Sequence, residues 1–244
     1  DMKFLFKDFL DEGDLDLVLE NNKFEVSDLD LILDEAARFC EDQLLPINQN
    51  GDGEGCKFEG GKVTTPSGFK NAYKTFVGNG WQGITLDKNF GGQGLPYVLG
   101  AFLDEMVTSS NMSFGNFPGL TTNAFEAIRK SASEDLKKLY LPKLATGEWS
   151  GTMNLTEPQC GTDLGLCRTM ARPQKDGSYK ITGTKIFITC GEHDMSENII
   201  HLVLAKTPNA PEGIKGISLF VVPKIIPNVD GSLGEINTLE CGSI

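Results

Sequence analysis

Residues 153–163 read Met-Asn-Leu-Thr-Glu-Pro-Gln-Cys-Gly-Thr-Asp, and residues 183–189 read Gly-Thr-Lys-Ile-Phe-Ile-Thr. The two stretches combine apolar residues, single hydroxyls and a Gly-Thr turn, a combination that suits a flat organic group with polar edges. Taken singly, Thr156 and Thr189 are ordinary β-branched strand residues, and Gly161-Thr162 is an ordinary turn. Taken together, the pattern favours a binding site.

A flavin ring is such a group, because it is a flat apolar surface edged with polar atoms. The hydroxyls of Thr156 and Thr189, and the backbone amides of Leu155, Thr156 and Thr189, are the predicted donors to that edge. The Phe187 ring is predicted to pack against one face of the ring system. Gly161 lacks a β-carbon, so the chain can pass close to a pyrophosphate, toward which the next amide and the Thr162 hydroxyl would point.

The same residues resemble the flavin-binding segment of the acyl-CoA dehydrogenases. Residues 81–84 (Trp-Gln-Gly-Ile) and 89–95 (Asn-Phe-Gly-Gly-Gln-Gly-Leu) are similar to the tryptophan-glycine segment of that family and the Gly-Gly-x-Gly loop after it. Residues 1–6, 186–194 and 216–224 resemble a larger-subunit branch, the one that contains 3-methylmercaptopropionyl-CoA dehydrogenase. Two positions depart from the common pattern: Thr162 stands where many members have Ser, and Phe187 stands where many have Trp.

The resemblance implies an FAD site and a reaction that oxidises an acyl-CoA thioester to its 2,3-enoyl product, with hydride transfer to the flavin. The cofactor-binding residues that it implies are Met153, Leu155, Thr156, Gly161, Thr162, Phe187, Ile188 and Thr189. Thr162 is also predicted to contact the substrate. The catalytic base of the family is a glutamate from a C-terminal helical bundle, so it is expected beyond Ile244. Glu157 precedes Pro158 and is held extended, so it is predicted to order its loop or pair with a cation instead.

The predicted fold class is α+β, with an N-terminal all-α helical domain over residues 1–148 and a small β-barrel or β-sandwich over residues 149–244. Residues 1–25 are predicted to be an N-terminal extension of the branch. The resemblance implies that the C-terminal bundle is missing from this chain, which alone is then expected to be inactive. Apolar residues at helical spacing predict four helices, in the following places: from an N-cap at Ser27 to Pro46, and over 99–107, 120–128 and 136–140, the last after a cap at Ser133.

Other segments are predicted from turn residues and alternation. Residues 50–55 are expected to form a flexible connection, and residues 58–65 a short hairpin. Strands are expected at 151–155, 179–189, 199–204 and 217–222, divided by turns at 176–177, 208–216 and 230–231. Residues 114–118 are expected on a turn that leads into a helix, where they line the acyl tunnel or pack in the core. Residues 191–194 are expected to be a solvated turn or to lie at the mouth of the ligand cleft.

The net charge of −12 and the pI near 4.6 argue against nucleic acid and against an anionic membrane surface as partners. Six cysteines show no CxxC pair, so free thiols in a reducing cytoplasm are expected. The only two histidines are His193 and His201, which makes a zinc site with Cys190 or Asp194 an unfavoured interpretation.

Three classes of function remain after the sequence is read. The first is an FAD-dependent acyl-CoA dehydrogenase that passes electrons to an electron-transfer flavoprotein and forms a homodimer or homotetramer; an acyl-CoA oxidase is its near relative. The second is a non-catalytic flavoprotein of the same fold that binds a partner. The third is a structural module without a cofactor, which leaves the joint occurrence of Thr156, Gly161, Thr162 and Thr189 unexplained.

Overall fold

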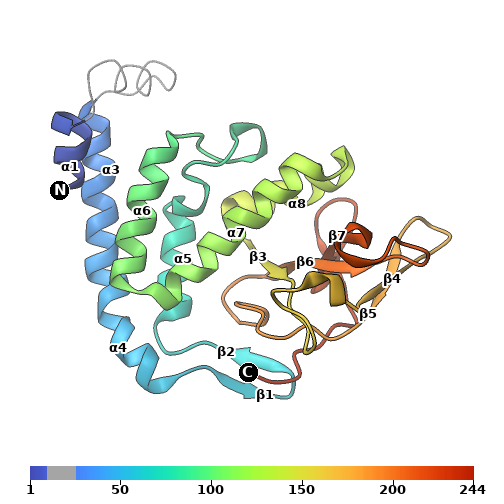
Figure 1. Cartoon of the computed structure of the whole chain (residues 1–244). Helices are drawn as coiled ribbons and strands as arrows, with labels where there is room; N and C mark the ends of the chain where they lie inside the picture. The colour runs from blue at the N-terminus through green and yellow to red at the C-terminus, as the bar shows by residue number, and fades with distance from the viewer. Residues whose placement is uncertain (10–25) are drawn as a thin grey trace.

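The computed structural model describes residues 1–9 and 26–244 (Figure 1). Helices occupy one side of the molecule and strands the other, with α7 and α8 between them, and the C-terminus lies beside the β1–β2 hairpin. The α+β class, with helices first and a sheet after them, is therefore confirmed. Most of the predicted extension over residues 1–25 lies outside the described residues.

The helices are α1 (Met2–Phe4), the π-helical turn η1 (Leu5–Phe9), α3 (Val26–Phe39), the π-helical turn η2 (Cys40–Leu44), α4 (Leu45–Glu54), α5 (Phe69–Gly78), α6 (Tyr97–Ser110), α7 (Met112–Ser131) and α8 (Glu134–Thr146). Short 3-10 turns are η3 (Trp81–Gly83), η4 (Lys88–Phe90), η5 (Leu164–Leu166) and η6 (Gly213–Gly216). None of the helices in the described residues is long and apolar enough to cross a membrane.

The strands are β1 (Lys57–Glu59), β2 (Lys62–Thr64), β3 (Trp149–Asn154), β4 (Met170–Pro173), β5 (Tyr179–Thr182), β6 (Asn198–Lys206), β7 (Ile217–Pro223), β8 (Ile225–Pro227) and β9 (Leu233–Ile236). Five of them form one mixed sheet in the order β3-β6-β4-β5, and β7 also pairs with β6. β3 runs parallel to β6, whereas β7 is antiparallel to β6. β1–β2 and β8–β9 are separate antiparallel hairpins.

The first predicted helix differs from the structure at both ends. α3 already contains Val26 and Ser27, so Ser27 does not precede the helix as an N-cap. Pro46 does not end the helical path. The π turn η2 connects α3 directly to α4, and Pro46 falls in the first turn of α4. Proline has no N–H to donate, and it stands where the hydrogen-bond pattern changes from the π turn, in which Leu45 N–H donates to the carbonyl of Cys40, to the α-helix.

The glycine-rich segment 50–55, predicted as a flexible connection, is helical as far as Glu54. Gly51 is buried in this helix, and a β-carbon on it would lie 2.6 Å from Cε2 of Phe69. The glycine is therefore needed for the close approach of the Phe69 ring rather than for flexibility. The predicted hairpin at 58–65 is confirmed as β1 and β2.

The other three predicted helices are confirmed as α6, α7 and α8, and Ser133 caps α8 by accepting a hydrogen bond from Leu136 N at 3.5 Å. Residues 114–118 lie inside α7 rather than on a turn before it. The side chain of Asn111, which was not predicted as a cap, caps α7 by accepting from Phe114 N at 3.0 Å. Phe114 is fully buried among the rings of Phe69, Tyr73 and Phe76, which is the core-packing alternative.

The two faces of the sheet are buried against different material. On one face, α7 and α8 cover β3 and β6, and Trp149, Ile200 and Leu202 join their apolar cluster. Gly151 permits this contact, because a β-carbon on it would lie 2.4 Å from Cβ of Ala124. The alternate β3 residues, Ser150 and Thr152, are also buried; Ser150 contacts His193 in the segment before β6, and Thr152 contacts His201 of β6.

Candidate functional site

The two stretches predicted to hold the cofactor come together at the end of β3. The backbone N–H of Ile186 donates to the carbonyl of Thr156 at 2.9 Å. The ammonium of Lys185 donates to the carbonyl of Leu155 at 3.0 Å and to Glu157 Oε1 at 2.8 Å. Residues 155–157 and 185–187 therefore form one structural unit although 28 positions separate Glu157 from Lys185.

Glu157 is the centre of this unit. Its carboxylate is 3% exposed and accepts hydrogen bonds from a ring of donors: Lys185 Nζ, Thr169 Oγ1 and N, Arg168 N, Cys167 Sγ and Gln159 Nε2. Burial alone would raise the pKa of this carboxyl, but the donors outweigh it and hold the pKa far below its ordinary value. A carboxylate so engaged orders its loop and pairs with a cation, as the sequence predicted.

Lys185, Thr169 and Cys167 were not identified from the sequence. Lysine side chains are mostly exposed in proteins, yet the side chain of Lys185 is only 8% exposed. Thr169 donates to Glu157 through its hydroxyl at 2.5 Å and is 2% exposed. The usable signal was the only cation of the second stretch, Lys185, together with the glutamate of the first, because buried charges in proteins are paired.

The segment 183–189 is not a strand, which corrects the prediction for 179–189 beyond Thr182. Gly183 lies against Thr169, with its absent β-carbon position only 2.3 Å from Oγ1 of that residue. The chain therefore leaves β5 in contact with the Glu157 unit, and its next polar bonds go to residues 155–157 rather than to a neighbouring strand. β-branched composition matched a strand, but these long-range bonds set the conformation.

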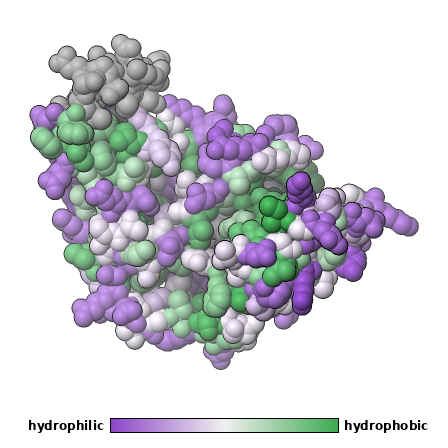
Figure 2. Space-filling view, in the orientation of Figure 1, coloured by the Kyte–Doolittle hydropathy of each residue, from purple (hydrophilic) through white to green (hydrophobic). Residues whose placement is uncertain are grey.

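Phe187 lies at the outer edge of this unit with 88% of its surface exposed and a φ of 56°. Left-handed backbone is uncommon for a residue other than glycine, and for a bulky residue it indicates a conformation imposed by the surroundings. Met153 at the end of β3 and Leu166 on η5 are exposed by 37% and 54%. Figure 2 shows apolar surface over the strand-rich part, from β3 to the C-terminus, on a face where hydrophilic and apolar residues are otherwise mixed.

The remaining predicted residues lie on the same loops. Gly161 is half-buried beside Thr156, and a β-carbon on it would meet only Thr156 Cγ2, at an ordinary 3.5 Å. Thr162 and Thr189 are exposed, whereas Leu155, Thr156 and Ile188 are half-buried. Exposed hydroxyls next to exposed apolar side chains fit a flat group with polar edges, which is the chemistry of a flavin.

Both histidines contact β3: His193 belongs to the predicted turn 191–194, and His201 belongs to β6, within the predicted strand 199–204. Ser150 Oγ lies 2.9 Å from Nε2 of His193, whose Nδ1 accepts from Met195 N at 3.1 Å. Because Nδ1 is an acceptor, the ring proton is on Nε2 and points at Ser150, so His193 cannot act as a base toward that hydroxyl. Burial lowers the pKa of His193 to about 4.

His201 is held in the same way by the next inward-facing hydroxyl of β3. Its Nδ1 lies 2.8 Å from Thr152 Oγ1, and burial lowers its pKa to about 4. Neither histidine belongs to a group of three or more metal-ligating side chains within the described residues. The turn at 191–194 was predicted to be solvated, but His193 in it is only 3% exposed and is bonded to β3.

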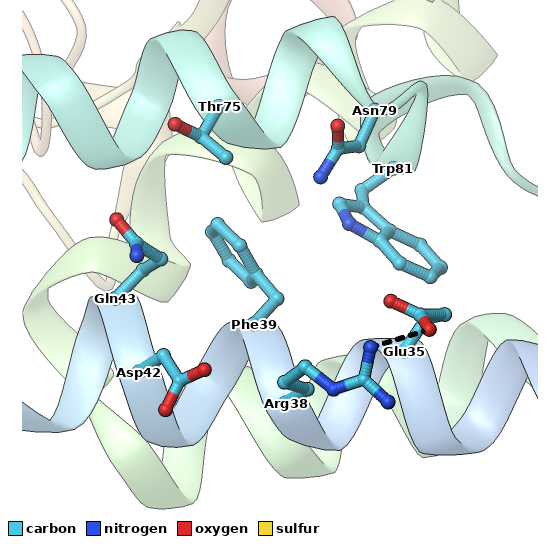
Figure 3. Close-up of a pocket in the computed structure, with 8 residues that line it drawn as sticks. All are labelled: Glu35, Arg38, Phe39, Asp42, Gln43, Thr75, Asn79 and Trp81. Atoms are coloured by element: carbon cyan, nitrogen blue, oxygen red, sulfur yellow. Dashed lines mark hydrogen bonds and ion pairs between the residues drawn. The ribbon is translucent and has the colours of Figure 1, made fainter.

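Two adjoining pockets of about 430 and 190 Å³ lie elsewhere, in the described residues before β3. This region, called the helical part, includes the β1–β2 hairpin and Thr65. In the smaller one, the Phe39 ring of α3 and the indole of Trp81 point into the space between the helices, beside an ion pair of Arg38 with Glu35 (Figure 3). Neither pocket is lined by a predicted cofactor residue. The Trp81 segment and the Glu157 unit are therefore separate sites in this fold.

Comparison with known proteins places these features in one family. The model of the "Acyl-CoA dehydrogenase, N-terminal domain" matches residues 27–148, and that of the "Acyl-CoA dehydrogenase, middle domain" matches residues 152–235. The chain is 52% identical to 3-methylmercaptopropionyl-CoA dehydrogenase of Ruegeria pomeroyi over 91% of its own length and 38% of that protein. It thus spans well under half of that curated relative, and the branch predicted from the sequence is confirmed.

Solved structures have a similar fold. An acyl-CoA dehydrogenase of Bacillus anthracis complexed with FAD superposes with a TM-score of 0.65 at 26% identity, over 82% of this chain and 31% of the other. A structure described as the electron transferring flavoprotein of Acidaminococcus fermentans superposes with a TM-score of 0.67 at 27% identity, over 81% of this chain and 48% of the other.

Proposed function

Because this chain belongs to the acyl-CoA dehydrogenase family, we propose that the gene product containing it is an FAD-dependent enzyme that oxidises an acyl-CoA thioester to the 2,3-enoyl-CoA. The observation that carries the proposal is the union of residues 155–157 with residues 185–187 through Lys185 and Ile186. A similar protein of known structure, the Bacillus anthracis acyl-CoA dehydrogenase, was solved with FAD, which supports the cofactor.

The residues around Glu157 would bind and orient the flavin, and a bound flavin supplies a two-electron acceptor. Thr156 and the backbone amide of Leu155 would donate hydrogen bonds to polar atoms of the ring. Thr189, through its hydroxyl and backbone amide, would donate to the opposite edge. The exposed Phe187 ring would pack on one face, since flat apolar surfaces stack. Gly161 and Thr162 would face the pyrophosphate, and Thr162 would also touch the substrate.

Met153 and Ile188 complete the proposed cofactor site. Met153 is exposed at the end of β3, and Ile188 is half-buried beside Phe187. Both would offer apolar surface to the ring system, and neither contributes a proton donor in this role.

The base for the α-proton is proposed to lie outside residues 1–244, on the part of the gene product that follows them. Glu157 is unsuited to the task because its carboxylate already accepts from Lys185, Thr169, Arg168, Cys167 and Gln159. Its pKa is held low, which makes it a poor proton acceptor near neutral pH.

We further propose an electron-transfer flavoprotein as the electron acceptor, consistent with the similarity to the Acidaminococcus fermentans structure. A homodimer or homotetramer of the gene product and a cytoplasmic location are also proposed, the latter because all six cysteines are free thiols. The proposed boundary between the two domains falls at residues 148 and 149, between α8 and β3.

An anaerobic titration of the complete gene product with acyl-CoAs of graded chain length tests this function. Loss of visible flavin absorbance with one length class is expected, and the length class identifies the substrate. Rapid reoxidation by air after that loss would identify an acyl-CoA oxidase. A flavin spectrum unchanged by every thioester would identify a non-catalytic flavoprotein, and absence of flavin from the purified protein would contradict the proposal.

A further inference from the structure

Residues 190–196, here called the anchor loop, connect the predicted flavin segment 183–189 to β6. Three consecutive residues of this loop bind three different parts of the molecule. The first, Glu192, forms an ion pair with Lys224, which follows β7. Its side chain is only 7% exposed, so this pair is shielded from solvent more than an ordinary surface pair.

The second residue, His193, joins the anchor loop to β3 and α7. Its Nε2–H donates to Ser150 Oγ of β3 at 2.9 Å. Its ring meets the Phe117 ring of α7 edge to face, with centroids 5.0 Å apart and planes at 86°. Polar and aromatic contacts therefore fix the imidazole from two elements at once.

The third residue, Asp194, joins the anchor loop to the helical part. Its Oδ1 accepts from the backbone N–H of Thr65 at 3.0 Å and from the Thr65 hydroxyl at 2.8 Å, across 129 positions of sequence. Thr65 directly follows β2 and is 7% exposed. Lys70 Nζ of α5 lies 3.8 Å from Oδ2. Burial would raise the pKa of Asp194, but the Thr65 bonds outweigh it and lower the pKa, so the carboxylate stays charged.

The chain between this anchor and the predicted flavin edge is short and tightly turned. Gly191 N donates to the carbonyl of Ile188 at 3.0 Å, and both Phe187 and Cys190 have a φ of 56°. A β-carbon on Gly191 would lie 3.0 Å from Ile188, so the turn leaves little free space. Only five positions separate Thr189 from Asp194. Because the intervening turn is tight, a shift of the anchor loop is expected to move Phe187 and Thr189 as well.

We propose that Asp194 is a positioning residue, which fixes Phe187 and Thr189 against the flavin by tying the anchor loop to Thr65 of the helical part. The inference rests on the proposed function, because it assigns Phe187 and Thr189 to the cofactor. It makes the flavin geometry depend on the position of the β1–β2 hairpin, which lies below the loops of the strand-rich part in Figure 1. Asp194 itself touches neither cofactor nor substrate in this role.

The chain contains a matched control for the two bonds that Asp194 makes. Asp176 Oδ1 accepts from Ser178 N at 3.0 Å and from the Ser178 hydroxyl at 2.7 Å, in the turn between β4 and β5. Those bonds are local and exposed, and they involve no residue of the helical part. Asp176→Ala therefore removes the same pair of bonds without disturbing the link between the two parts.

The test compares Asp194→Ala, Asp194→Asn and Asp176→Ala in the complete gene product. We expect Asp194→Ala to change the visible circular dichroism of bound FAD, to weaken FAD binding about tenfold and to speed amide exchange over residues 187–192. Asp194→Asn keeps an acceptor oxygen for Thr65 and should restore most of the FAD signal, while Asp176→Ala should match the wild type. If Asp194→Ala and Asp176→Ala give the same FAD spectrum and the same exchange over 187–192, the proposal is wrong.

Thr65→Val provides a milder variant in case Asp194→Ala does not fold. It removes only the hydroxyl bond and keeps the backbone N–H, so we expect a smaller change in the same direction. A wild-type protein without FAD would overturn the proposed function, whereas the amide exchange of residues 187–192 would still test whether Asp194 positions this segment. The two proposals therefore fail by different results.

Discussion

The helical part and the strand-rich part of this chain bury different chemistry. In the helical part, the buried side chains that pack with Phe114 form an apolar cluster, and the rings of Phe69, Tyr73 and Phe76 each contact the Phe114 ring. In the strand-rich part, one sheet face covers an apolar cluster, but the other covers charged and polar groups. Within the described residues, the buried side chains that can ionise near or below neutral pH include Glu157, Glu192, His193 and His201, which all belong to this second part.

The difference follows from what each part must hold. A helix satisfies its own backbone polar groups, so helices need only an apolar face to pack. The loops after β3 and β5 have no such internal partners, and bonds from Lys185, Glu157 and Asp194 hold them instead. Directional bonds define position more sharply than apolar contacts, which suits the role proposed for these loops, to present single hydroxyls to a cofactor.

The largest effect on stability is expected from Phe114→Ala in the helical core. The side chain is fully buried, with the Phe76 ring centroid 5.8 Å away, so its removal leaves a cavity. We expect a loss of about 3–5 kcal/mol in the free energy of unfolding, measured by urea denaturation. Tyr97→Ala is the control, because Tyr97 is 82% exposed and its loss should cost little. Equal losses for both variants would contradict an apolar origin of helical stability.

The second prediction addresses the polar interior. Lys185→Met leaves the buried Glu157 carboxylate without its cation, so we expect a loss of about 3 kcal/mol. The double variant Lys185→Met/Glu157→Gln removes both charges and should be more stable than Lys185→Met alone. The exposed pair of Lys143 with Glu148 is the control, and Lys143→Met should cost less than about 1 kcal/mol. A double variant less stable than the single one would show that the charges themselves are required.

The same contrast explains how much of the fold could be predicted from the sequence. Helical spacing located α6, α7 and α8, and hydroxyl capping located the start of α8, because both are local properties. The helix continues past Pro46 because a π turn precedes it, and the helix through Gly51 packs against the ring of Phe69, which is distant in sequence. Such features leave no periodic signal in the residues around them.

In the candidate site, residue types were predictable and conformations were not. The joint pattern of Thr156, Gly161, Thr162 and Thr189 is the basis of the proposed cofactor site, and the position of Glu157 before a proline identified its ordering role. The left-handed backbone of Phe187 depends on bonds that Lys185 and Ile186 make far away in sequence. Inward-facing hydroxyls at alternate positions 150 and 152 were the available signal for the buried histidines.

The third prediction uses pH to separate the two parts. His193 and His201 have pKa values lowered to about 4 by burial, against about 6.5 in an unfolded chain. The unfolded state therefore binds more protons between these values, so stability is fully present above pH 6.5 and is lost as pH falls toward 4. At pH 5 we expect each histidine to have lowered the free energy of unfolding by about 2 kcal/mol, relative to pH 7.

Urea denaturation at pH 7 and pH 5 measures this loss, and His193→Gln should reduce the difference between the two pH values by about half. Glu157 contributes little to this difference, because its stabilisation is lost only as pH falls through the ordinary carboxyl range, which lies below pH 5. Amide exchange at pH 5 should increase first in β3 and β6, where Ser150 and Thr152 contact the imidazoles. Faster exchange in α6 and α7 before these strands would contradict the assignment of acid sensitivity to the strand-rich part.

The smallest effect on stability is expected at Gly161, and it separates the needs of the fold from those of the cofactor. A β-carbon there meets only Thr156 Cγ2 at 3.5 Å, so Gly161→Ala should change the free energy of unfolding by less than about 0.5 kcal/mol. If the glycine instead makes room for the pyrophosphate, the same variant should weaken FAD binding about tenfold, measured by flavin fluorescence. Gly151→Ala is the opposite control, because its β-carbon would lie 2.4 Å from Ala124 and should destabilise the fold itself. Unchanged FAD affinity in Gly161→Ala would place the phosphates elsewhere and leave Gly161 as an ordinary turn residue.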